Sequence, residues 1–133
     1  MIFVDTSVWV AALRDGASAE AVHLRTLLDA DEVGLAAPVR LEILSGASRR
    51  DRGRLRATLD ALPLFLPNEG TWDRLDQWVD RAGDAGERFG FADLLVAAVA
   101  ADHRAPLWSN DHDFTRMRSL GLVELHRPGA TTR

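Results

Sequence analysis

The chain contains no cysteine, no lysine and no tyrosine among its 133 residues. Without cysteine it can form neither a disulfide framework nor a thiolate metal site. It also has no apolar run that approaches the length of a membrane span. The N-terminus lacks a basic region followed by a long apolar stretch, so no secretory signal is visible. These absences predict a cytoplasmic protein that has no membrane partner.

Because lysine is absent, all 16 basic residues are arginine, and the net charge of the chain is −4. This acidic balance argues weakly against a general nucleic-acid binder. A local basic patch can still bind phosphate on a protein that is acidic overall. One segment carries five arginines, namely Arg49, Arg50, Arg52, Arg54 and Arg56. A solvated helix face also explains this segment, so both interpretations stay open.

Short apolar, β-favouring segments alternate with segments of helical periodicity along the whole chain. Strands are expected at residues 2–4, 33–36, 64–66, 107–109 and 123–125. Helices between successive strands predict an α/β fold, with a parallel sheet, helices on both faces and right-handed crossovers. The length suits one domain with its own core, which we expect to span residues 1–126. Residues 127–133 are expected to form a frayed C-terminal tail.

Local signals describe two of the helices in more detail. Asp51 is interpreted as the cap of a helix that carries Leu55 and Leu59 on one face. Asn68 is expected to open the longest helix of the chain. The buried stripe of that helix is predicted to comprise Trp72, Leu75, Trp78, Val79 and Ala82.

Four acidic residues lie in apolar surroundings where a strand ends or a helix begins. Asp5 follows the first strand, and Glu42 lies in the first turns of the helix after the second strand. Asp93 lies in the first turn of the most apolar helix, and Asp111 follows the fourth strand. Each acid alone can be read as a helix cap or as a partner of a helix dipole. In a parallel sheet, however, all four positions fall on one edge, which predicts a common site.

Carboxylates that converge with no lysine nearby repel one another strongly in a low-dielectric cleft. A hard divalent cation with oxygen ligands neutralises such a cluster. Mg²⁺ or Mn²⁺ fits this donor set, whereas zinc is disfavoured because thiolates are absent and no histidine pair has ligand spacing. A bound cation of this kind lowers the pKa of a water and polarises a phosphoryl oxygen. The chemistry predicted is therefore phosphate-ester hydrolysis.

The motifs around these acids resemble those of the PIN-domain ribonucleases, most closely the VapC-type toxins of bacterial toxin–antitoxin pairs. The order and spacing of the motifs agree with that family, and the chain has the length of the whole family domain. One departure is Ser109, which stands where many relatives carry threonine. The matching motifs are Val4-Asp5-Thr6-Ser7, Leu41-Glu42-Ile43-Leu44-Ser45-Gly46, Phe91-Ala92-Asp93-Leu94-Leu95-Val96-Ala97-Ala98 and Asn110-Asp111-His112-Asp113-Phe114.

The resemblance implies a three-layer α/β/α sandwich with a five-stranded parallel sheet in the order 3-2-1-4-5. It implies hydrolysis of RNA with Mg²⁺ or Mn²⁺, a homodimer, and inhibition by a cognate antitoxin protein. It implies a set of catalytic and metal-binding acids, which are Asp5, Glu42, Asp93 and Asp111. The supporting residues would be Thr6, Ser7, Asn110 and Asp113. Candidate contacts to the RNA backbone are Arg88, Arg49, Arg50 and Arg52, although Arg88 also suits an ordinary surface loop.

Two other classes of function remain open from the sequence. One is a PIN-like module that holds RNA or a partner without cutting it. The other is a small phosphatase of the haloacid-dehalogenase type, which needs a second aspartate where this chain has Ser7. For the partners, the tryptophans Trp9, Trp72, Trp78 and Trp108 are either core residues or, where exposed, anchors for another protein chain.

Overall fold

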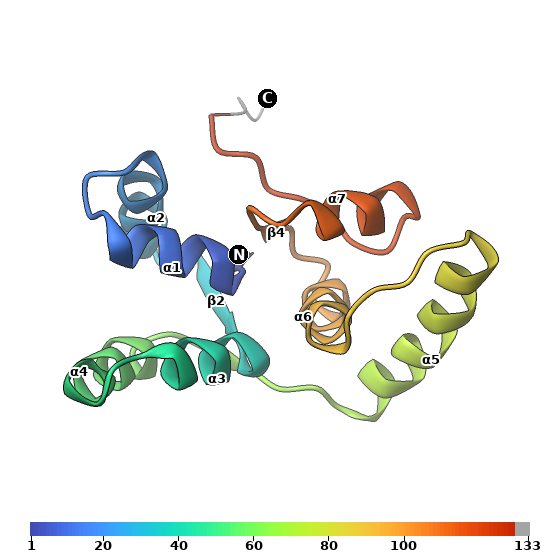
Figure 1. Cartoon of the computed structure of the whole chain (residues 1–133), viewed down its shortest axis with the longest axis horizontal. Helices are drawn as coiled ribbons and strands as arrows, with labels where there is room; N and C mark the ends of the chain where they lie inside the picture. Colours follow the sequence, from blue (N-terminus) through green and yellow to red (C-terminus); the bar gives the residue numbers. More distant parts are fainter. Residues whose placement is uncertain (130–133) are drawn as a thin grey trace.

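The computed structural model describes residues 1–129 and shows a parallel sheet of four strands in the order β3-β2-β1-β4 (Figure 1). The strands are β1 (Ile2–Val4), β2 (Val33–Ala36), β3 (Leu64–Phe65) and β4 (Leu107–Trp108). Strand β1 is central: Ile2 pairs with Val33 of β2, and Phe3 pairs with Leu107 of β4. The C-terminal end of β1 therefore lies in the middle of the sheet edge.

Helices cover both faces of this sheet, as the alternating pattern predicts. In Figure 1, α1 (Thr6–Arg14), α2 (Ala19–Asp29), α3 (Ala37–Gly46) and α4 (Arg49–Asp60) lie on one side of the strands. Helices α5 (Glu69–Asp84), α6 (Phe91–Asp102) and α7 (His112–Ser119) lie on the other side. This division follows from right-handed crossovers, because the chain moves outward from β1 to β3 and then returns across the sheet to β4.

The prediction of a fifth strand at residues 123–125 is wrong, because a single parallel bridge joins Leu125 to Leu107 instead. Leu107 N–H donates to the carbonyl of Glu124 at 2.8 Å, and His126 N–H donates to the carbonyl of Leu107 at 2.9 Å. The neighbours of Leu107 bond in the opposite direction, toward β1. Strand β4 has only two residues, and only Leu107 faces the segment around Leu125, so one bridge forms there instead of a strand.

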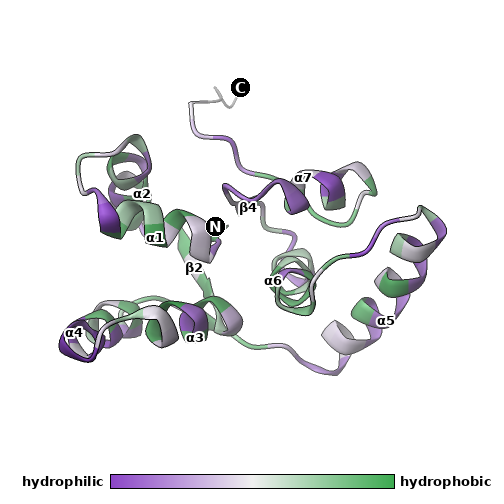
Figure 2. Ribbon diagram, in the orientation of Figure 1, coloured by the Kyte–Doolittle hydropathy of each residue, from purple (hydrophilic) through white to green (hydrophobic). Residues whose placement is uncertain are grey.

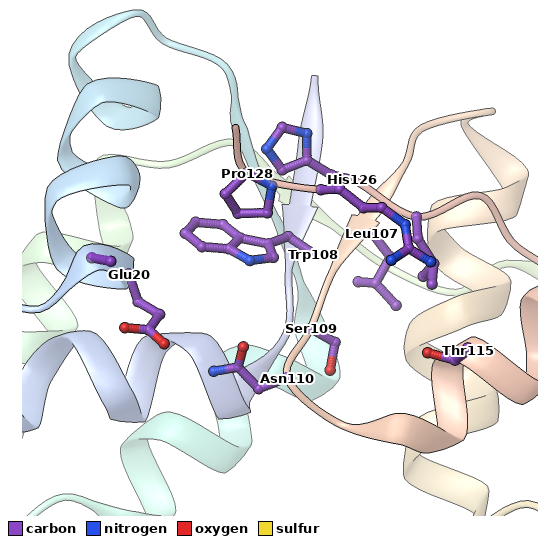
Figure 3. Close-up of a pocket in the computed structure, with 11 residues that line it drawn as sticks. Glu20, Leu107, Trp108, Ser109, Asn110, Thr115, His126 and Pro128 are labelled. Atoms are coloured by element: carbon purple, nitrogen blue, oxygen red, sulfur yellow. The ribbon is translucent and has the colours of Figure 1, made fainter. Parts of the chain in front are cut away.

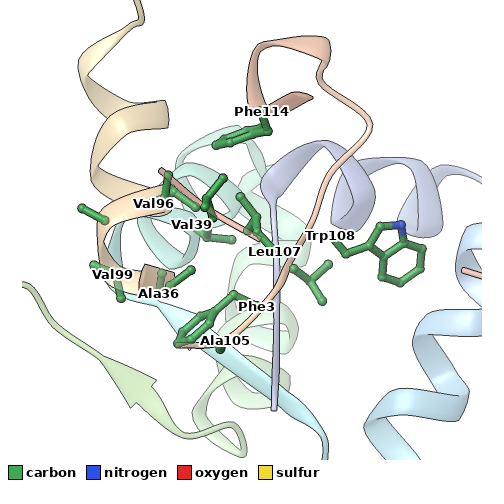
Figure 4. Packing of buried hydrophobic residues seen from close by; sticks show 14 of the residues in the cluster. Phe3, Ala36, Val39, Val96, Val99, Ala105, Leu107, Trp108 and Phe114 are labelled. Carbon is green, nitrogen blue, oxygen red and sulfur yellow. The ribbon is translucent and has the colours of Figure 1, made fainter. Parts of the chain in front are cut away.

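Helix α6 forms the centre of the molecule and is apolar almost all round (Figure 2). Its segment 96–100 is buried completely against the sheet and the neighbouring helices. Figure 4 shows Val96 and Val99 of α6 packed near Phe3 of β1 and Leu107 of β4. Among residues 1–129, no helix combines the length and the apolar character that a membrane crossing requires.

Helix α4 begins earlier than the sequence indicates, so the assignment of Asp51 as its cap is wrong. Ser48 is the N-cap, and its Oγ accepts the N–H of Asp51 at 3.1 Å. An N-cap side chain bonds the N–H groups two or three residues ahead, which places Asp51 inside the first turn. There its negative charge interacts favourably with the positive end of the helix dipole.

Helix α5 is the longest helix of the described chain, and Asn68 caps it as predicted. Leu75, Trp78 and Ala82 are buried on its inner face, as the predicted stripe requires. Trp72 and Val79 are not part of that stripe, because 48% and 59% of their surfaces are exposed. Thr71 takes the inner position of the first turn in place of Trp72.

Thr71 is fully buried and joins the start of α5 to the end of α6. Its hydroxyl accepts the N–H of Asn68 at 2.9 Å and also donates to the Asp102 carboxylate. Arg74 Nε donates to the other oxygen of the same carboxylate at 2.8 Å. The threonine hydroxyl therefore satisfies a backbone N–H and a partly buried charge at once.

The variant Thr71→Val keeps the shape of this side chain and removes its hydroxyl. We expect a loss of about 1–3 kcal/mol in the free energy of unfolding, because a buried N–H and a carboxylate each lose a partner. Urea denaturation measures this loss. Thr58→Val is the matched control, because the exposed Thr58 hydroxyl bonds only to the carbonyl of Arg54. Similar losses in both variants would contradict this role of Thr71.

Candidate metal centre

Asp5 stands at the end of the central strand β1 and is only 5% exposed. It caps α1, since its Oδ2 accepts the N–H of Ser7 at 3.4 Å. The hydroxyls of Ser7 and Ser109 donate to the same oxygen at 2.9 and 2.8 Å. Within residues 1–129 these bonds all end on Oδ2, so the other oxygen is left for a cation. Asp5 thus combines the role of cap with the position expected of a ligand.

Two serine hydroxyls join the ends of β1 and β4 around Asp5. Ser7 Oγ lies 3.2 Å from Ser109 Oγ and accepts the N–H of Asn110 at 3.0 Å. Ser109 Oγ accepts the N–H of Asp111 at 2.9 Å. Ser109 therefore supplies the hydroxyl that threonine would supply at this position, and it fixes Asp111 relative to Asp5.

Glu42 reaches the same edge of the sheet from α3. Thr6 Oγ1, in the first turn of α1, donates to Glu42 Oε1 at 2.9 Å. Apart from this hydrogen bond, the Glu42 side chain is exposed to solvent. Thr6 thus supports a site acid, which is the role that the resemblance implies for it.

The remaining acids come from the N-terminal ends of α6 and α7. One carboxylate oxygen from each of Asp93, Asp111 and Asp113 lies within 4.8 Å of the others. Asp111 is the N-cap of α7, and its Oδ1 accepts the N–H of Asp113 at 2.9 Å. Asp113, expected only in a supporting role, therefore lies in the same group as Asp93 and Asp111.

The electrostatics of Asp93 show that the acids converge. Burial, which is the largest cause, and four neighbouring carboxylates together raise the pKa of its carboxyl from 3.8 to about 6. In falling order of effect these neighbours are Asp111, Asp5, Asp113 and Glu42. All four acids singled out in the sequence therefore share one electrostatic environment.

Arg116 is a residue of this site that sequence reasoning missed. Its Nη2 donates to Asp113 Oδ1 at 2.6 Å, and its Nη1 is paired with Glu87. Its guanidinium carbon also lies 4.9 Å from the centre of the Phe89 ring. The available signal was its spacing, three residues after Asp113 on the same helix. Arg116 holds Asp113 in place from the side of the α5–α6 loop.

The other arginines suggested by the sequence are not paired with the acids in the part of the chain that the structure describes. Arg88 is exposed in the loop before α6, and Arg49, Arg50 and Arg52 are exposed on α4. Among the interactions of residues 1–129, none joins these four side chains to the acidic cluster. Their contact with RNA stays a prediction.

The donor set fits a hard divalent cation. Every side chain of the cluster offers carboxylate oxygens, and Asp93, Asp111 and Asp113 are close enough to share one ion. Oxygen-only sites of this charge suit Mg²⁺ or Mn²⁺, and a bound cation would relieve the repulsion that raises the pKa of Asp93.

Comparison with known proteins assigns the family. Residues 2–120 match the PIN domain. The chain belongs to the PIN domain family. Ribonuclease VapC11 of Mycobacterium tuberculosis is 34% identical to this PIN domain over 124 residues, covering 86% of this chain and 89% of that protein. The resemblance to VapC-type proteins is thereby confirmed.

Solved structures show the same PIN fold. The VapBC2 complex from Rickettsia felis, bound to a DNA fragment from its promoter, contains a chain with a TM-score of 0.78 at 20% identity. The match covers 95% of this chain and 98% of that chain. Mycobacterium tuberculosis VapC20, a Sarcin-Ricin loop cleaving toxin, gives a TM-score of 0.61 at 22% identity, covering 87% and 94% of the two chains.

The raised pKa of Asp93 predicts a pH-dependent cost to the metal-free PIN domain. The folded protein holds this proton more tightly than the unfolded chain, so stability falls as pH rises from about 4 to about 6. We expect Asp93→Asn to stabilise the protein in EDTA at pH 7.5 by roughly 1 kcal/mol, allowing for solvent screening of a partly exposed group.

Denaturant titrations at several pH values measure this gain, which should shrink toward pH 4. Asp76→Asn, on the exposed face of α5, is the control and should change little. A gain that does not depend on pH would show that charge repulsion at Asp93 is not its cause.

Proposed function

We propose that this protein is a Mg²⁺- or Mn²⁺-dependent endoribonuclease that acts as the toxin of a toxin–antitoxin pair. The observation that carries the proposal is the convergence of Asp5, Glu42, Asp93, Asp111 and Asp113 at one edge of the sheet. Relatives named as VapC ribonucleases and a structural neighbour described as a toxin that cleaves an RNA loop support RNA as the substrate.

In this proposal Asp5 and Asp93 would bind the cation, and Asp111 and Asp113 would complete its ligands. When bound, the cation lowers the pKa of a water and stabilises charge on the phosphate. Glu42, oriented by Thr6, positions the attacking water opposite the leaving oxygen. Addition of water across the bond between phosphorus and the 3′ oxygen yields a 5′-phosphate and a free 3′-hydroxyl. The hydroxyls of Ser7 and Ser109 hold Asp5 and Asp111 at a fixed position relative to each other during this reaction.

The proposal includes a cognate antitoxin and a homodimer as partners. Solved relatives are toxin–antitoxin complexes, some of them bound to DNA. Three of the four tryptophans are buried in the core, whereas Trp72 is exposed and stacks on the exposed Phe91 at 6.1 Å. An exposed aromatic pair of this kind suits a protein contact.

Removing a ligand charge should abolish RNA cleavage. We expect Asp5→Asn and Asp93→Asn to reduce the cleavage rate of a structured RNA pool by about 100-fold or more, because each substitution removes a metal-binding carboxylate. Circular dichroism verifies folding, and Asp76→Asn is the control. If the folded variants cut RNA at the parental rate, the site is wrong. If the parental protein binds RNA but does not cut it, the non-catalytic module replaces this proposal.

The cation itself should bind with a pH dependence set by Asp93. A protonated carboxyl cannot serve as a ligand, so affinity for Mn²⁺ should rise as pH increases through about 6. Calorimetry between pH 5 and pH 7.5 measures this rise, and Asp93→Asn should remove most of the binding. Affinity that is flat across this range would contradict Asp93 as a ligand.

A further inference from the structure

A pocket of about 560 Å³ opens directly beside the acidic site (Figure 3). It lies between the start of α2, the end of β4 and the segment 125–128. Ser109 and Asn110 line one end of it, and Ser109 also donates to Asp5. Because Asp111 is the next residue along the chain, the pocket begins where the acidic site ends.

One wall of this pocket is aromatic and held in place. Trp108 and His126 form it, and their rings meet edge to face with centres 5.9 Å apart. The His126 ring stacks on His23, and their Nε2 atoms are 2.8 Å apart. Burial and the nearby His23 lower the pKa of His126, which keeps this wall uncharged at neutral pH. Because Trp108 is only 3% exposed, the half-buried His126 ring is the aromatic surface that an unstacked base can contact.

The polar groups of the pocket identify which base fits. Glu20 lies in the first turn of α2, and Figure 3 shows its carboxylate and the Asn110 amide pointing toward one another. A carboxylate only accepts hydrogen bonds. Guanine presents two N–H groups side by side on its Watson–Crick edge, which match the two oxygens of one carboxylate. Uracil presents a single N–H between two carbonyls there, so it meets Glu20 with repulsion.

A positive charge lies at the rim of the same pocket. Arg127 lines it and is exposed, so its guanidinium can reach a phosphate next to the bound base. The pocket thus offers an aromatic ring, an acceptor for N–H groups and a cation within one volume that adjoins the acids.

We propose that this pocket binds the guanine of the nucleotide adjoining the scissile phosphate, and that Glu20 makes the protein select RNA containing guanine at that position. This rests on the proposed cleavage of RNA. The pocket proposal adds that Glu20 selects the base, and that the selected base belongs to the nucleotide next to the cleaved bond.

Two measurements test the pocket, and the first does not depend on catalysis. Calorimetry compares guanosine 5′-monophosphate with uridine 5′-monophosphate on the wild type, Glu20→Gln and Glu69→Gln. Glu69 is the matched control, because it is also the acidic residue in the first turn of its helix. We expect the guanine nucleotide to bind about 10-fold more tightly than the uracil nucleotide, and Glu20→Gln alone to lose this preference.

The second measurement maps cleavage sites in a randomised RNA pool by sequencing. Guanine should be enriched at one position beside the cut, and Glu20→Gln should remove that enrichment. Thr115→Phe, which fills the pocket from α7, should weaken binding of the guanine nucleotide as well.

The outcomes separate the two proposals. Guanine preference in calorimetry without any cleavage of RNA would overturn the nuclease and the position beside a cut, and would leave only the guanine site at Glu20. Cleavage without guanine enrichment, or an enrichment that survives Glu20→Gln, would overturn the pocket and leave the nuclease standing. Equal affinity for both nucleotides would also overturn the pocket proposal, because Glu20 would then not select the base.

Discussion

The bonds to one oxygen of Asp5 are the interaction on which the site depends. Asp5 ends the central strand, and Ser7 and Ser109 bring hydroxyls to its Oδ2 from α1 and from the end of β4. The backbone contributes to the same junction, since Asp5 N–H donates to the carbonyl of Trp108 at 2.8 Å. A charge that is 5% exposed is tolerated because these donors replace its water.

Repulsion is the second constraint, and it couples the site to a cation. The end of β1, the middle of α3 and the starts of α6 and α7 bring five carboxylates together, and burial together with this repulsion raises the pKa of Asp93. Arg116 offsets part of this charge, but only at Asp113, where it also bonds Glu87. The fold therefore maintains a site in which carboxylates repel one another, as the proposed divalent ion would require.

The short fourth strand shapes the surface beside this site. Because β4 ends at Trp108, the chain turns at once toward α7 and leaves Ser109 and Asn110 at the head of a pocket. The single bridge at Leu125 then carries His126 onto His23 and Trp108. A longer fifth strand would pair along this edge and leave less room for the pocket.

The sequence alone determined the α/β class and the positions of the acids along the chain, while the order of the four strands was implied by the resemblance. The class follows from the alternation of local signals, and the acids stood out because each lies in apolar surroundings near the end of a strand or the first turns of a helix. The resemblance to VapC-type PIN domains could be recognised from the same short motifs. The expected fifth strand, the cap at Asp51 and the burial of Trp72 and Val79 failed, because a local pattern does not show which neighbour a segment will meet.

Only the tertiary structure decided which side chains share space. Asp113 joins Asp93 and Asp111 because α7 begins beside the first turn of α6, and Arg116 meets Glu87 across 29 positions of chain. His23 and His126 are 103 positions apart and yet lie in contact. The physical reason is that spacing along a helix or a strand determines which face a residue occupies. The distance between two faces depends on how the elements pack.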